Sequence, residues 1–441
     1  MLHSNSQKIR QRIADDSTMT IRLNKFFERV MRFLLRHAKE IQQKGLSVVV
    51  RKICFLLAMA PGLLALLIVR ALRPIVVIRF GALISESLGH FAMNTELFLC
   101  ERDAGMHSRC TFDVFYNNST QVCNLQLKKM WDRILPTFRF VRVVGALNRF
   151  LPGAAHHVIP MPSDRDIHGL LERTRTHLSF TAEEERLGRA GLRELGIPEG
   201  SPFICFYARD SVYMDNWFPG GNWRYHDYRN CSIHNYVPAV EELTRRGYFA
   251  VRMGAIAKEA LTIKNAMIID YATNGRTDFL DIFLSGKCRF CLGSSGGVIA
   301  VPAIFRRPVA YANSVPLEYA HTWRASDLFI PKKLWFRQER RFFTFREILD
   351  SGVGKFLRSE QYERLGLEVI ENTPEEVTAL ALEMDERLKG TWQTTEQDEE
   401  LQRRFWEIFR RSLISISQSL HGEIRSRIGT LFLRRNSALL E

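Results

Sequence analysis

From residue 74 onward, short apolar runs alternate with stretches in which apolar residues recur every three to four positions. Short runs bounded by Gly, Pro or Asp are typical of buried strands, and the longer spacing is typical of amphipathic helices. This alternation predicts a mixed α/β fold in which helices cover parallel strands. At 441 residues the chain is long enough for two such domains, with further segments at both ends.

The first of the two predicted domains covers residues 74–200. It begins with a strand at residues 74–80, and a polar loop then leads into a helix at residues 88–101. Near its end, Thr181 can cap a surface helix that stops at Gly196. Three further runs predict strands with less sharp boundaries, at residues 111–116, 138–144 and 157–159.

The second predicted domain covers residues 201–390 and has the more regular pattern. It predicts a doubly wound sheet, in which ligands bind beyond the carboxyl ends of the strands. Two such domains in tandem would enclose a cleft, where small-molecule sites concentrate. The predicted strands are residues 203–207, 249–253, 267–270, 289–292 and 309–312, and the predicted helices are residues 237–246, 277–284 and 298–305.

A glycine-rich elbow, residues 294–297, joins the strand at residues 289–292 to the helix that follows it. Ser294 and Ser295 supply hydroxyl groups, and Gly296 and Gly297 let a ligand approach the main chain closely. Such a turn can also point backbone N–H groups at a phosphate. A plain tight turn uses the same residue types, so the elbow is predicted to cradle a diphosphate only if it faces the first domain.

Polar residues also follow the neighbouring strands of the second domain. Arg209 and Asp210 come after the strand at residues 203–207, while Arg252 and Tyr271 end the next two strands. Arginine pairs with phosphate oxygens through two N–H groups at once, although Arg209 and Asp210 could instead form an ordinary ion pair. With the elbow, these residues are predicted to surround a nucleoside diphosphate. The remaining members of this donor-binding set are Tyr228, Arg229 and Asn230, in the loop between the first two strands, and Asn313.

The first domain offers a candidate general base, His90, at the start of the helix at residues 88–101. A helix N-terminus disfavours the imidazolium, and the neutral ring can accept a proton from a hydroxyl. Glu86, in the loop before His90, is the alternative base, and a capping or core role is the structural alternative for His90. Asn94 shares the helix face of His90, whereas Glu96 is expected to orient a neighbour; both are placed on the acceptor side.

Other motifs exclude several kinds of chemistry. Asp164 and Asp166 form a DxD pair of the kind that metal-dependent sugar transferases use, but they precede a helix and are interpreted as N-cap residues. No HExxH, GxSxG or Walker pattern occurs, which argues against metalloproteases, serine hydrolases and P-loop NTPases. The eight cysteines lack the spacing of a disulfide framework, and the CxxC of Cys288 and Cys291 lies within a strand, so reduced thiols without a metal are expected.

The formal net charge of +14 belongs to the ends of the chain. Residues 1–52 hold 12 Lys and Arg against 4 Asp and Glu, residues 401–441 hold 8 against 3, and the residues between them carry about +1. Cations clustered at the ends suit an anionic lipid surface better than a nucleic-acid groove across the fold. No zinc-finger spacing and no aromatic-basic RNA motif supports a nucleic-acid partner.

Residues 53–69 are uncharged and strongly apolar, with Pro61 and Gly62 near the middle. As a helix they would reach only about 25 Å, less than the roughly 30 Å hydrocarbon core of a bilayer. Because cations flank both sides, a kinked monotopic insertion or a buried core helix is favoured over a span. We therefore expect residues 1–73 to form a basic helical region that holds the protein, as a peripheral or monotopic protein, at the cytoplasmic face of the inner membrane.

Basic amphipathic stretches flank the body at residues 21–44 and 401–433. In the second stretch, apolar residues such as Phe405 and Phe409 recur every three to four positions. Residues 391–441 are therefore predicted to form an amphipathic C-terminal helix, whose apolar face would either bind lipid or pack on the body.

The motif Arg-Phe-Gly-x7-Gly-His at residues 79–90 precedes Asn-Thr-Glu-Leu-Phe-Leu at residues 94–99. Together with four later stretches, it resembles a bacterial family of glycosyltransferases linked to surface-carbohydrate synthesis, over about residues 74–390. More distantly the chain is similar to the GT-B transferases that include the heptosyltransferases. This resemblance implies two Rossmann-like domains facing each other across a cleft and an inverting, metal-independent reaction; where that family has an aspartate base, this chain has His90. The four stretches are residues 228–236, 251–254, 277–282 and 330–333.

The sequence therefore predicts a glycosyltransferase that moves a sugar from a nucleotide-diphosphate donor to a hydroxyl of a glycan or lipid-linked acceptor. In this hypothesis His90 deprotonates the attacking hydroxyl, while Arg209, Arg229 and the elbow stabilise the departing diphosphate. No cofactor is expected, and the expected partners are the donor, the acceptor and an anionic membrane surface, without nucleic acid. Two alternatives stay open: a nucleotide-sugar epimerase, and a non-catalytic binder of nucleotide sugars or glycolipids at the membrane.

Overall fold

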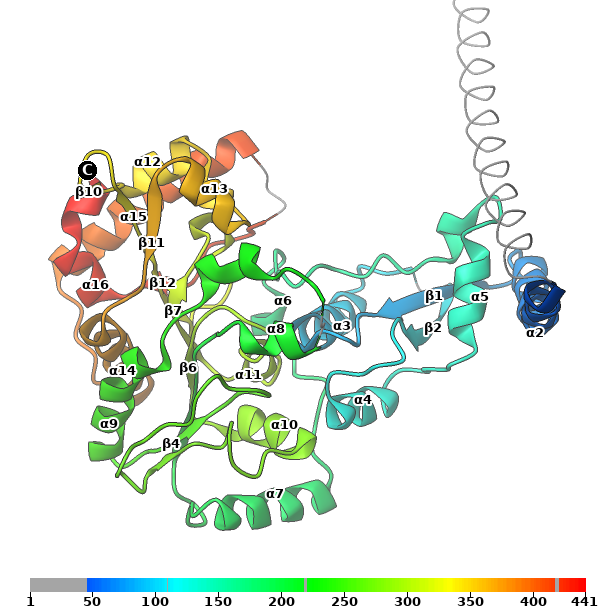
Figure 1. Ribbon diagram of the computed structural model, residues 1–441, viewed down its shortest axis with the longest axis horizontal. Coiled ribbons are helices and arrows are strands. Elements are labelled where there is room, and N and C mark those ends of the chain that lie inside the picture. The colour runs from blue at the N-terminus through cyan, green and yellow to red at the C-terminus, as the bar shows by residue number, and fades with distance from the viewer. Residues whose placement is uncertain (1–45, 109, 218–219, 417–419) are drawn as a thin grey trace, which may run out of the picture. The chain divides into compact units, whose positions relative to one another are not determined.

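A computed structural model describes residues 46–108, 110–217, 220–416 and 420–441 (Figure 1). The chain divides into two compact units. The smaller unit contains the described residues up to Pro74 together with Val143–Pro152, and the larger contains Ile75–Arg142 with Gly153–Glu441. The domain boundaries at residues 74, 201 and 391 stay predictions.

The smaller unit is built on two helices, α2 (Leu46–Ala71) and α5 (Val141–Asn148). The helices touch at Gly62, where a Cβ would lie 3.0 Å from a side-chain methyl of Val143. Arg70 ties the end of α2 to the end of α5 by donating to Asn148 Oδ1 at 2.6 Å. Residues 53–69 thus lie in a helix that contains Pro61. Of the helices in the described part of the chain, none has the length and apolar composition to cross a bilayer.

The strand predicted at residues 138–144 is wrong, because most of that segment belongs to α5. Only its beginning pairs with a strand: the Phe138 N–H donates to the Phe115 carbonyl at 2.9 Å. Val141 and Val144 are both buried, and their spacing of three residues is that of a helix face. The spacing of Val141, Val143 and Val144 fits either a strand or a helix, and packing decided for the helix.

A small parallel sheet opens the larger unit. Strand β1 (Val77–Leu83) pairs in register with β2 (Thr111–Asn117), and α3 (Leu88–Asp103) crosses between them. These elements confirm the strand at residues 111–116 and the helix at residues 88–101. The predicted strand at residues 157–159 is reduced to one bridge, between Val158 and Phe80. Helices α4 (Leu125–Asp132), α6 (Leu170–Arg173) and α7 (Ala182–Glu194) complete this part.

Helix α7 begins and ends as its sequence predicts. The Thr181 hydroxyl accepts from the Glu184 N–H at 3.2 Å, and the Glu184 carboxylate accepts from the Thr181 N–H at 3.0 Å. This reciprocal capping box satisfies two amides that a helix start leaves unpaired. Gly196, with a φ of 78°, allows the chain to turn in the left-handed region just after the helix.

The second sheet has seven strands in the order β12-β8-β7-β6-β3-β4-β5, and all of its pairings are parallel. Counted from β3, six consecutive strands take the order 3-2-1-4-5-6, which is the doubly wound arrangement. The chain reverses its direction of winding between β3 and β6. The strands are β3 (Phe203–Tyr207), β4 (Phe249–Arg252), β5 (Ile268–Ile269), β6 (Cys291–Gly293), β7 (Val309–Ser314), β8 (Leu328–Pro331) and β12 (Arg427–Ile428).

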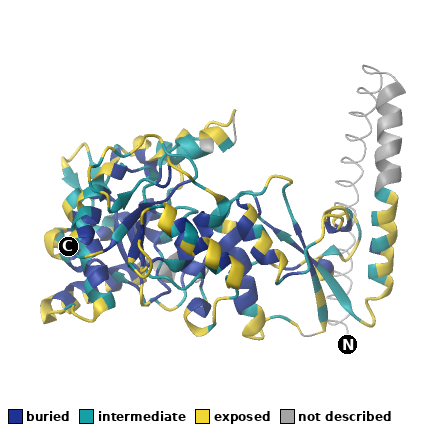
Figure 2. Ribbon diagram, turned by 90° about the horizontal axis from the view of Figure 1, so that it is seen from below, coloured by how far each residue is buried: buried dark blue, intermediate teal, exposed yellow. Residues whose placement is uncertain are grey.

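Helices cover this sheet, and the buried residues gather on the strands and on the helix faces turned toward them (Figure 2). Helices α9 (Val237–Arg245) and α14 (Pro374–Lys389) pack side by side (Figure 1). Helix α10 (Asp278–Lys287) and the short α11 (Ala300–Ile304) follow β5 and β6. All five strands and three helices predicted for residues 201–390 are confirmed, with ends shifted by at most three residues. The remaining elements are α8 (Val212–Trp217), α12 (Phe345–Asp350), α13 (Ser359–Arg364) and an antiparallel sheet of β9 (Lys333–Phe336), β10 (Arg341–Phe342) and β11 (Leu367–Ile370).

The C-terminal segment packs on the body. Helix α15 (Glu396–Ile416) places Phe405 and Phe409 at 0% exposure, with the Phe405 ring 6.0 Å from that of Phe329 in β8. The helix predicted over residues 391–441 is confirmed only for Glu396–Ile416, because the chain later adds β12 to the sheet edge and forms α16 (Thr430–Arg435). A buried aromatic face explains the amphipathic pattern without lipid. The other basic stretch, residues 21–44, lies outside the described residues.

Candidate functional site

A cavity of about 580 Å³ opens beyond the carboxyl ends of the central strands of the seven-stranded sheet. Its wall includes Tyr207 to Asp210 after β3 and Ser295 to Val298 after β6. These two strands are neighbours at the point where the winding reverses, and there the loops separate to leave a crevice. The opposite wall comes from the loop between β1 and α3, residues Glu86 to His90. The cavity therefore lies between two halves of the larger unit. The first half, up to residue 200, carries the two-stranded sheet, and the second half, from residue 201, carries the seven-stranded sheet.

The elbow after β6 is tightly folded and faces the first half. The Ser294 hydroxyl is buried and accepts from the Arg209 N–H at 2.9 Å, so it holds the loop after β3 in place. A Cβ on Gly89 would lie 2.9 Å from the Cα of Gly297. The elbow and the start of α3 thus meet main chain to main chain, which confirms that the elbow faces the first half. Helix α11 behind the elbow has only five residues, too short for a strong helix dipole.

Arg209 and Arg229 in the cavity wall have no carboxylate within 4.0 Å among the described residues. Arg209 is buried, and it donates to Asn230 Oδ1 and, at 3.4 Å, to the His226 carbonyl. Arg229 is half-buried and donates to the Ser295 carbonyl of the elbow at 3.2 Å. Burial, followed by the nearby charge of Arg229, lowers the pKa of Arg209. Two neighbouring cations, one buried and one half-buried, with no carboxylate in ion-pair contact are an anion-binding arrangement.

Other charged residues of the wall are already neutralised. Arg252 pairs with Asp270 at 3.2 Å, and Arg276 pairs with Asp281 at 2.6 Å. Asp210 accepts from the backbone N–H groups of Val212 and Lys258, at 3.1 and 3.0 Å. The carboxylate of Asp210 therefore shapes two loops, and the ion pair with Arg209 is not formed. Arg209 and Arg229 thus differ from Arg252 and Arg276, which are already paired with carboxylates. Arg165 also has no carboxylate partner among the described residues, but its guanidinium donates to three main-chain carbonyls.

His90 is exposed and lines the cavity from the first turn of α3. Its Nδ1 lies 3.4 Å from Asn94 Oδ1, one turn further along the same face. An amide oxygen accepts, so this contact places the proton on Nδ1 and leaves Nε2 free to accept another. Glu86 lines the same wall; Asn118 donates to its Oε1 at 3.0 Å, and its buried Oε2 has no partner among the described residues. Both candidate bases thus reach the cavity.

Several residues of the predicted set do not line the cavity. The Tyr271 hydroxyl donates to Asp281 Oδ1 of α10 at 3.0 Å and accepts from the N–H of Thr277, the N-cap residue of that helix. Asn313, in the left-handed region with a φ of 55°, exchanges hydrogen bonds with Asn372. Ser294 and Asn230 form hydrogen bonds with Arg209 but do not line the cavity. Asn94 contacts His90 and does not line the cavity either. The predicted residues that do line the cavity are Glu86, His90, Arg209, Asp210, Tyr228, Arg229, Arg252, Ser295, Gly296 and Gly297.

Two histidines of the wall were missed from the sequence. The His321 ring stacks on Tyr311 with centroids 4.2 Å apart, and its buried Nδ1 has no partner among the described residues. Burial, with the charge of Arg165 next, lowers the pKa of His321 to about 3. Burial, with the charge of Arg229 next, lowers the pKa of His226 to about 4. Both rings are neutral hydrogen-bonding groups at neutral pH. Neither follows a predicted strand directly, so no positional signal marked them.

The DxD segment supplies structural contacts. Asp166 accepts from the backbone N–H groups of Leu170 and Leu171, at 2.7 and 2.8 Å, so its carboxylate caps the start of α6, although Gly169 holds the N-cap position. Arg165 between the two aspartates donates to the carbonyls of Tyr319 and Ala320, at 3.2 and 2.9 Å. Its guanidinium is therefore occupied although it borders the cavity.

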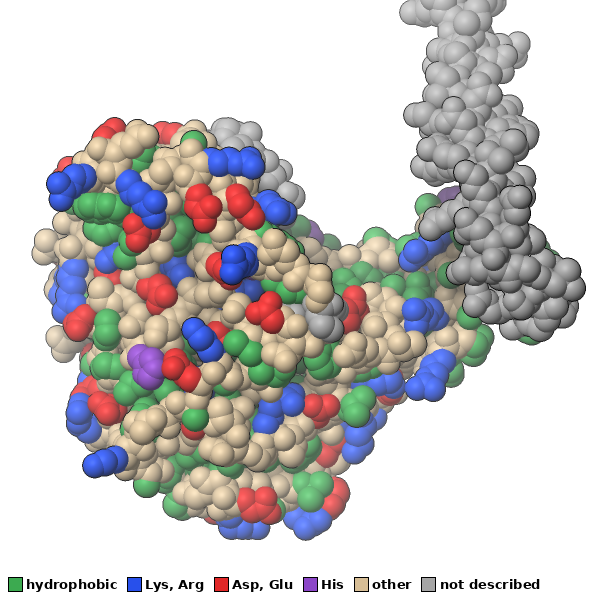
Figure 3. All heavy atoms as spheres, viewed as in Figure 1, with side chains coloured by type: hydrophobic (Ala, Val, Ile, Leu, Met, Phe, Trp, Pro, Cys, Tyr) green, Lys and Arg blue, Asp and Glu red, His purple; other side chains and the backbone are tan. Residues whose placement is uncertain are grey.

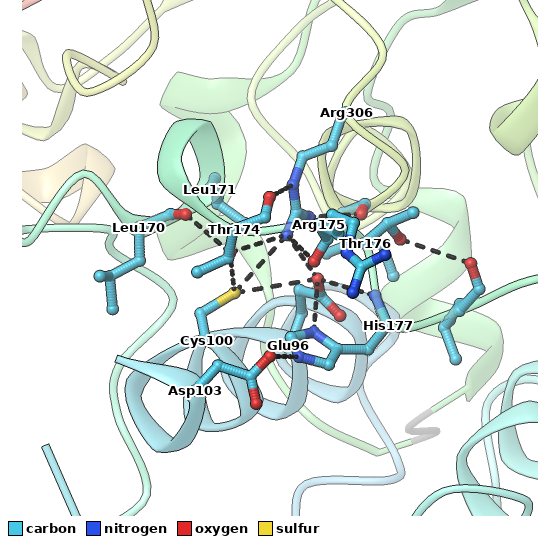
Figure 4. A network of polar contacts seen from close by, with 12 residues as sticks. Glu96, Cys100, Asp103, Leu170, Leu171, Thr174, Arg175, Thr176, His177 and Arg306 are labelled. Carbon is cyan, nitrogen blue, oxygen red and sulfur yellow. Dashed lines mark hydrogen bonds and ion pairs between the residues drawn. The ribbon is translucent and has the colours of Figure 1, made fainter. Parts of the chain in front are cut away.

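Glu96 lies on the face of α3 turned away from the cavity, in a polar cluster with Cys100 and His177 (Figure 4). The three ligand-type atoms lie within 4.8 Å of one another, which is close enough to hold a metal ion. However, Arg306 places its Nη2 2.7 Å from Glu96 Oε1 and 3.6 Å from Cys100 Sγ. A guanidinium against two of the three ligand atoms repels a cation, so we interpret the cluster as a charge-neutralised contact.

No family model and no curated protein sequence matches the chain. Among solved structures, the chain is similar to the glycosyl transferase family 9 protein from Veillonella parvula, with a TM-score of 0.34 and 9% identity over 54% of this chain and 80% of that one. It is also similar to the ADP-heptose lps heptosyltransferase II of E. coli, with a TM-score of 0.29 and 13% identity over 54% and 86%. Both neighbours are named as glycosyltransferases. Since both TM-scores lie below 0.5, neither match decides the function of this chain. The function has to be inferred from the residues of the cavity.

Proposed function

We propose that this protein is a glycosyltransferase that uses a nucleotide-diphosphate sugar as donor and a hydroxyl of a glycan or lipid-linked molecule as acceptor. The observation that carries the proposal is the pair Arg209 and Arg229, two cations without carboxylate partners among the described residues, beside the elbow. A diphosphate between them would receive bidentate hydrogen bonds and would offset the repulsion between two neighbouring cations, of which Arg209 is buried. A cavity of about 580 Å³ has the size of a small-molecule site.

The proposed reaction divides its work between the two walls. His90 Nε2 takes the proton of the acceptor hydroxyl while that oxygen attacks the anomeric carbon of the donor sugar. The bond from the anomeric carbon to the diphosphate oxygen breaks, and its electron pair leaves with the diphosphate. Arg209 and Arg229 stabilise the negative charge that grows there. Direct displacement inverts the anomeric centre and needs no metal. Glu86 is the alternative base.

The proposed domains follow this division. Residues 74–200 would hold the acceptor and residues 201–390 the donor, in a GT-B arrangement of two Rossmann-like domains. The first of these has a smaller sheet than expected, since two of its predicted strands are a helix and a single bridge. Support for the division comes from the wall itself: the bases lie on one side, and the unpaired arginines lie on the other.

We also propose that the smaller unit binds an anionic lipid surface, at the cytoplasmic face of the inner membrane. Helix α2 exposes Leu64 at 61%, Leu67 at 53% and Ile68 at 52%, and from Met59 to Val69 it has no polar side chain. A helix that is apolar all round and yet exposed calls for an apolar cover, and Arg70 and Arg73 follow at its end. Flotation of the full chain with vesicles containing anionic lipid tests this proposal. We expect Leu64→Glu with Leu67→Glu to abolish flotation, and equal flotation of both proteins would contradict it.

A panel of nucleotide-diphosphate sugars, offered with and without glycolipid extracts and followed by mass spectrometry, tests the main proposal. We expect one donor to release its nucleoside diphosphate and an acceptor to gain the mass of the sugar. An isomerised donor with no released nucleotide would instead establish an epimerase. Binding of a donor without any turnover, under all conditions in which the wild-type chain is folded, would establish a binding protein.

A further inference from the structure

Two helices run side by side away from the cavity, one from each wall. Helix α3 begins next to the candidate bases, and α11 begins behind the elbow. At the cavity end they meet through Gly89 and Gly297, whose main chains are in contact. That contact allows no side chain and makes no hydrogen bond of its own. Whatever holds the two helices in register must therefore act further along their length.

A buried ion pair joins the middle of α3 to the chain just beyond α11 (Figure 4). Glu96 of α3 is completely buried, and its Oε1 accepts from Arg306 Nη2 at 2.7 Å. Arg306 follows Phe305, the C-cap residue of α11, and has a φ of 61°, a left-handed conformation that non-glycine residues rarely adopt. The surroundings must hold this conformation, because it costs about 1 kcal/mol or more.

The guanidinium and the carboxylate are each shared with a third segment. Arg306 also donates to the Arg175 carbonyl at 3.0 Å and the Ile304 carbonyl at 2.6 Å. His177 lies between Glu96 Oε1, at 3.1 Å from its Nδ1, and Asp103 Oδ2, at 3.0 Å from its Nε2. The junction therefore fastens α3, the end of α11 and the chain at residues 174–177 at one point. Figure 4 shows these side chains converging on Glu96.

We propose that Glu96 and Arg306 are positioning residues that hold the base-bearing start of α3 against the elbow. The proposal rests on the proposed function, since it explains how an acceptor base and a donor phosphate site on different sheets keep their distance. The geometry acts as a clamp, with the glycine contact at the cavity end and the ion pair further along, at the middle of α3 and beyond the end of α11. A misplacement of about 1 Å in reacting groups can cost about 100-fold in rate, so loosening the ion pair reaches the chemistry.

Neither residue touches the cavity, so the clamp predicts a specific separation of effects. Donor binding depends on Arg209, Arg229 and the elbow, which all belong to the second half. In Glu96→Gln and Arg306→Gln, affinity for nucleoside diphosphates should stay within about twofold of the wild type. Sugar transfer should fall at least about tenfold, in kcat rather than in the KM for the donor. Arg306→Lys retains the charge and one hydrogen bond, so it should restore part of the rate.

Hydrogen exchange measured by mass spectrometry tests the clamp without any assay of transfer. In Glu96→Gln and Arg306→Gln, peptides covering residues 88–100 should exchange at least about tenfold faster than in the wild type. The matched control is Asp398→Asn, which removes another fully buried carboxylate from an arginine, Arg434, with Oδ1 2.5 Å from its Nε. That pair joins α15 to α16 and has no part in the cavity wall. The control should leave exchange in residues 88–100 unchanged.

The outcomes separate this inference from the proposed function. Unchanged exchange at residues 88–100 in Glu96→Gln overturns the clamp, whatever the activity. Faster exchange throughout the chain, or the same change in Asp398→Asn, also overturns it, because the residues would then serve general stability. Selective exchange in a protein that transfers no sugar from any donor would leave the clamp standing and refute the proposed function.

Discussion

The two walls of the cavity are built and charged differently. The donor wall belongs to a seven-stranded parallel sheet, and it presents Arg209 and Arg229, which have no acidic partner in the described structure. The wall that we propose to hold the acceptor, the acceptor wall, belongs to a two-stranded sheet, and it presents His90 and Glu86, the two candidate bases. In the proposed function, the donor wall holds the negative diphosphate and the acceptor wall takes up the proton of the attacking hydroxyl.

The difference also appears in how each wall is supported. Arg209 is held by its own half, through Asn230 and the Ser294 hydroxyl. His90 contacts Asn94 in its own helix, and the neighbouring Gly89 contacts Gly297 of the other half. Under the proposed function, we expect the donor wall to bind its ligand alone and the acceptor wall to work only when docked. Four experiments test this asymmetry.

The largest effect is expected from His90→Ala. Loss of a general base costs about 100- to 10,000-fold in rate, and nucleotide affinity should not change because His90 lies on the other wall. Nucleotide release measured beside calorimetric binding of the nucleoside diphosphate checks both halves of this statement. Glu86→Gln serves as the comparison: if it removes transfer while His90→Ala does not, the base is Glu86.

Arg229→Gln should mainly weaken donor binding. A hydrogen bond to a charged group contributes about 1.5–3 kcal/mol, so the dissociation constant of the nucleoside diphosphate should rise about 10- to 100-fold. Titration calorimetry measures this directly. Arg276→Gln is the control, since that cation lines the same cavity but is already paired with Asp281. An equal loss of affinity in both variants would refute the distinction between paired and unpaired arginines.

Gly89→Ala should separate the two walls slightly. Its Cβ would meet the Cα of Gly297 at 2.9 Å, and main chain cannot rotate away as a side chain can. We expect transfer to fall about tenfold with nucleotide affinity unchanged, because the shift affects alignment only. A normal rate in Gly89→Ala would show that the contact is not needed.

The smallest effect concerns stability and pH at the junction of the halves. Burial alone would lower the pKa of His177, but its interactions with Cys100, Glu96 and Asp103 outweigh burial and raise the pKa to about 10. Because the folded pKa exceeds the unfolded value of about 6.5, the stabilisation is complete below pH 6.5 and is lost as the pH rises through about 10. His177→Gln should therefore lower the free energy of unfolding by about 1–2 kcal/mol at pH 6, since solvent screens the Asp103 side. Denaturant titrations at pH 6, 8 and 10 should find the difference shrinking; a constant difference would contradict the charged histidine.

Much of the larger sheet could be predicted because its signals are local. Strand β3 is a buried apolar run followed by Arg209, and α10 begins at Thr277, whose hydroxyl accepts from the Leu280 N–H at 3.1 Å. Residues at the ends of such strands fall at one edge of a parallel sheet, so Arg209 and the elbow were correctly expected to lie together. The same reasoning brought His90 and Glu86 to the cavity.

The errors occurred where a local pattern fitted two structures. Residues 138–144 fit a strand as well as a helix, and burial of Val141 and Val144 on one face selected the helix. The amphipathic pattern after residue 401 predicted one helix over residues 391–441, yet the chain forms α15, β12 and α16 there, with Phe405 and Phe409 buried. Tyr271 and Asn313 stand at strand ends as predicted but point into neighbouring structure. Periodicity predicts which face of a helix or strand is buried, but it does not predict which other element covers that face.

By itself, the sequence of this protein determined the α/β class, the order of strands and helices in its second half, and the residue types at the strand ends, because all of these depend on short-range spacing. Only the tertiary structure decided which arginines lack acidic partners, which nitrogen of His90 is free, and that Glu96 faces Arg306 instead of the cavity. These properties depend on contacts between residues up to 210 positions apart. Such contacts arise from packing and leave no periodic trace along the chain.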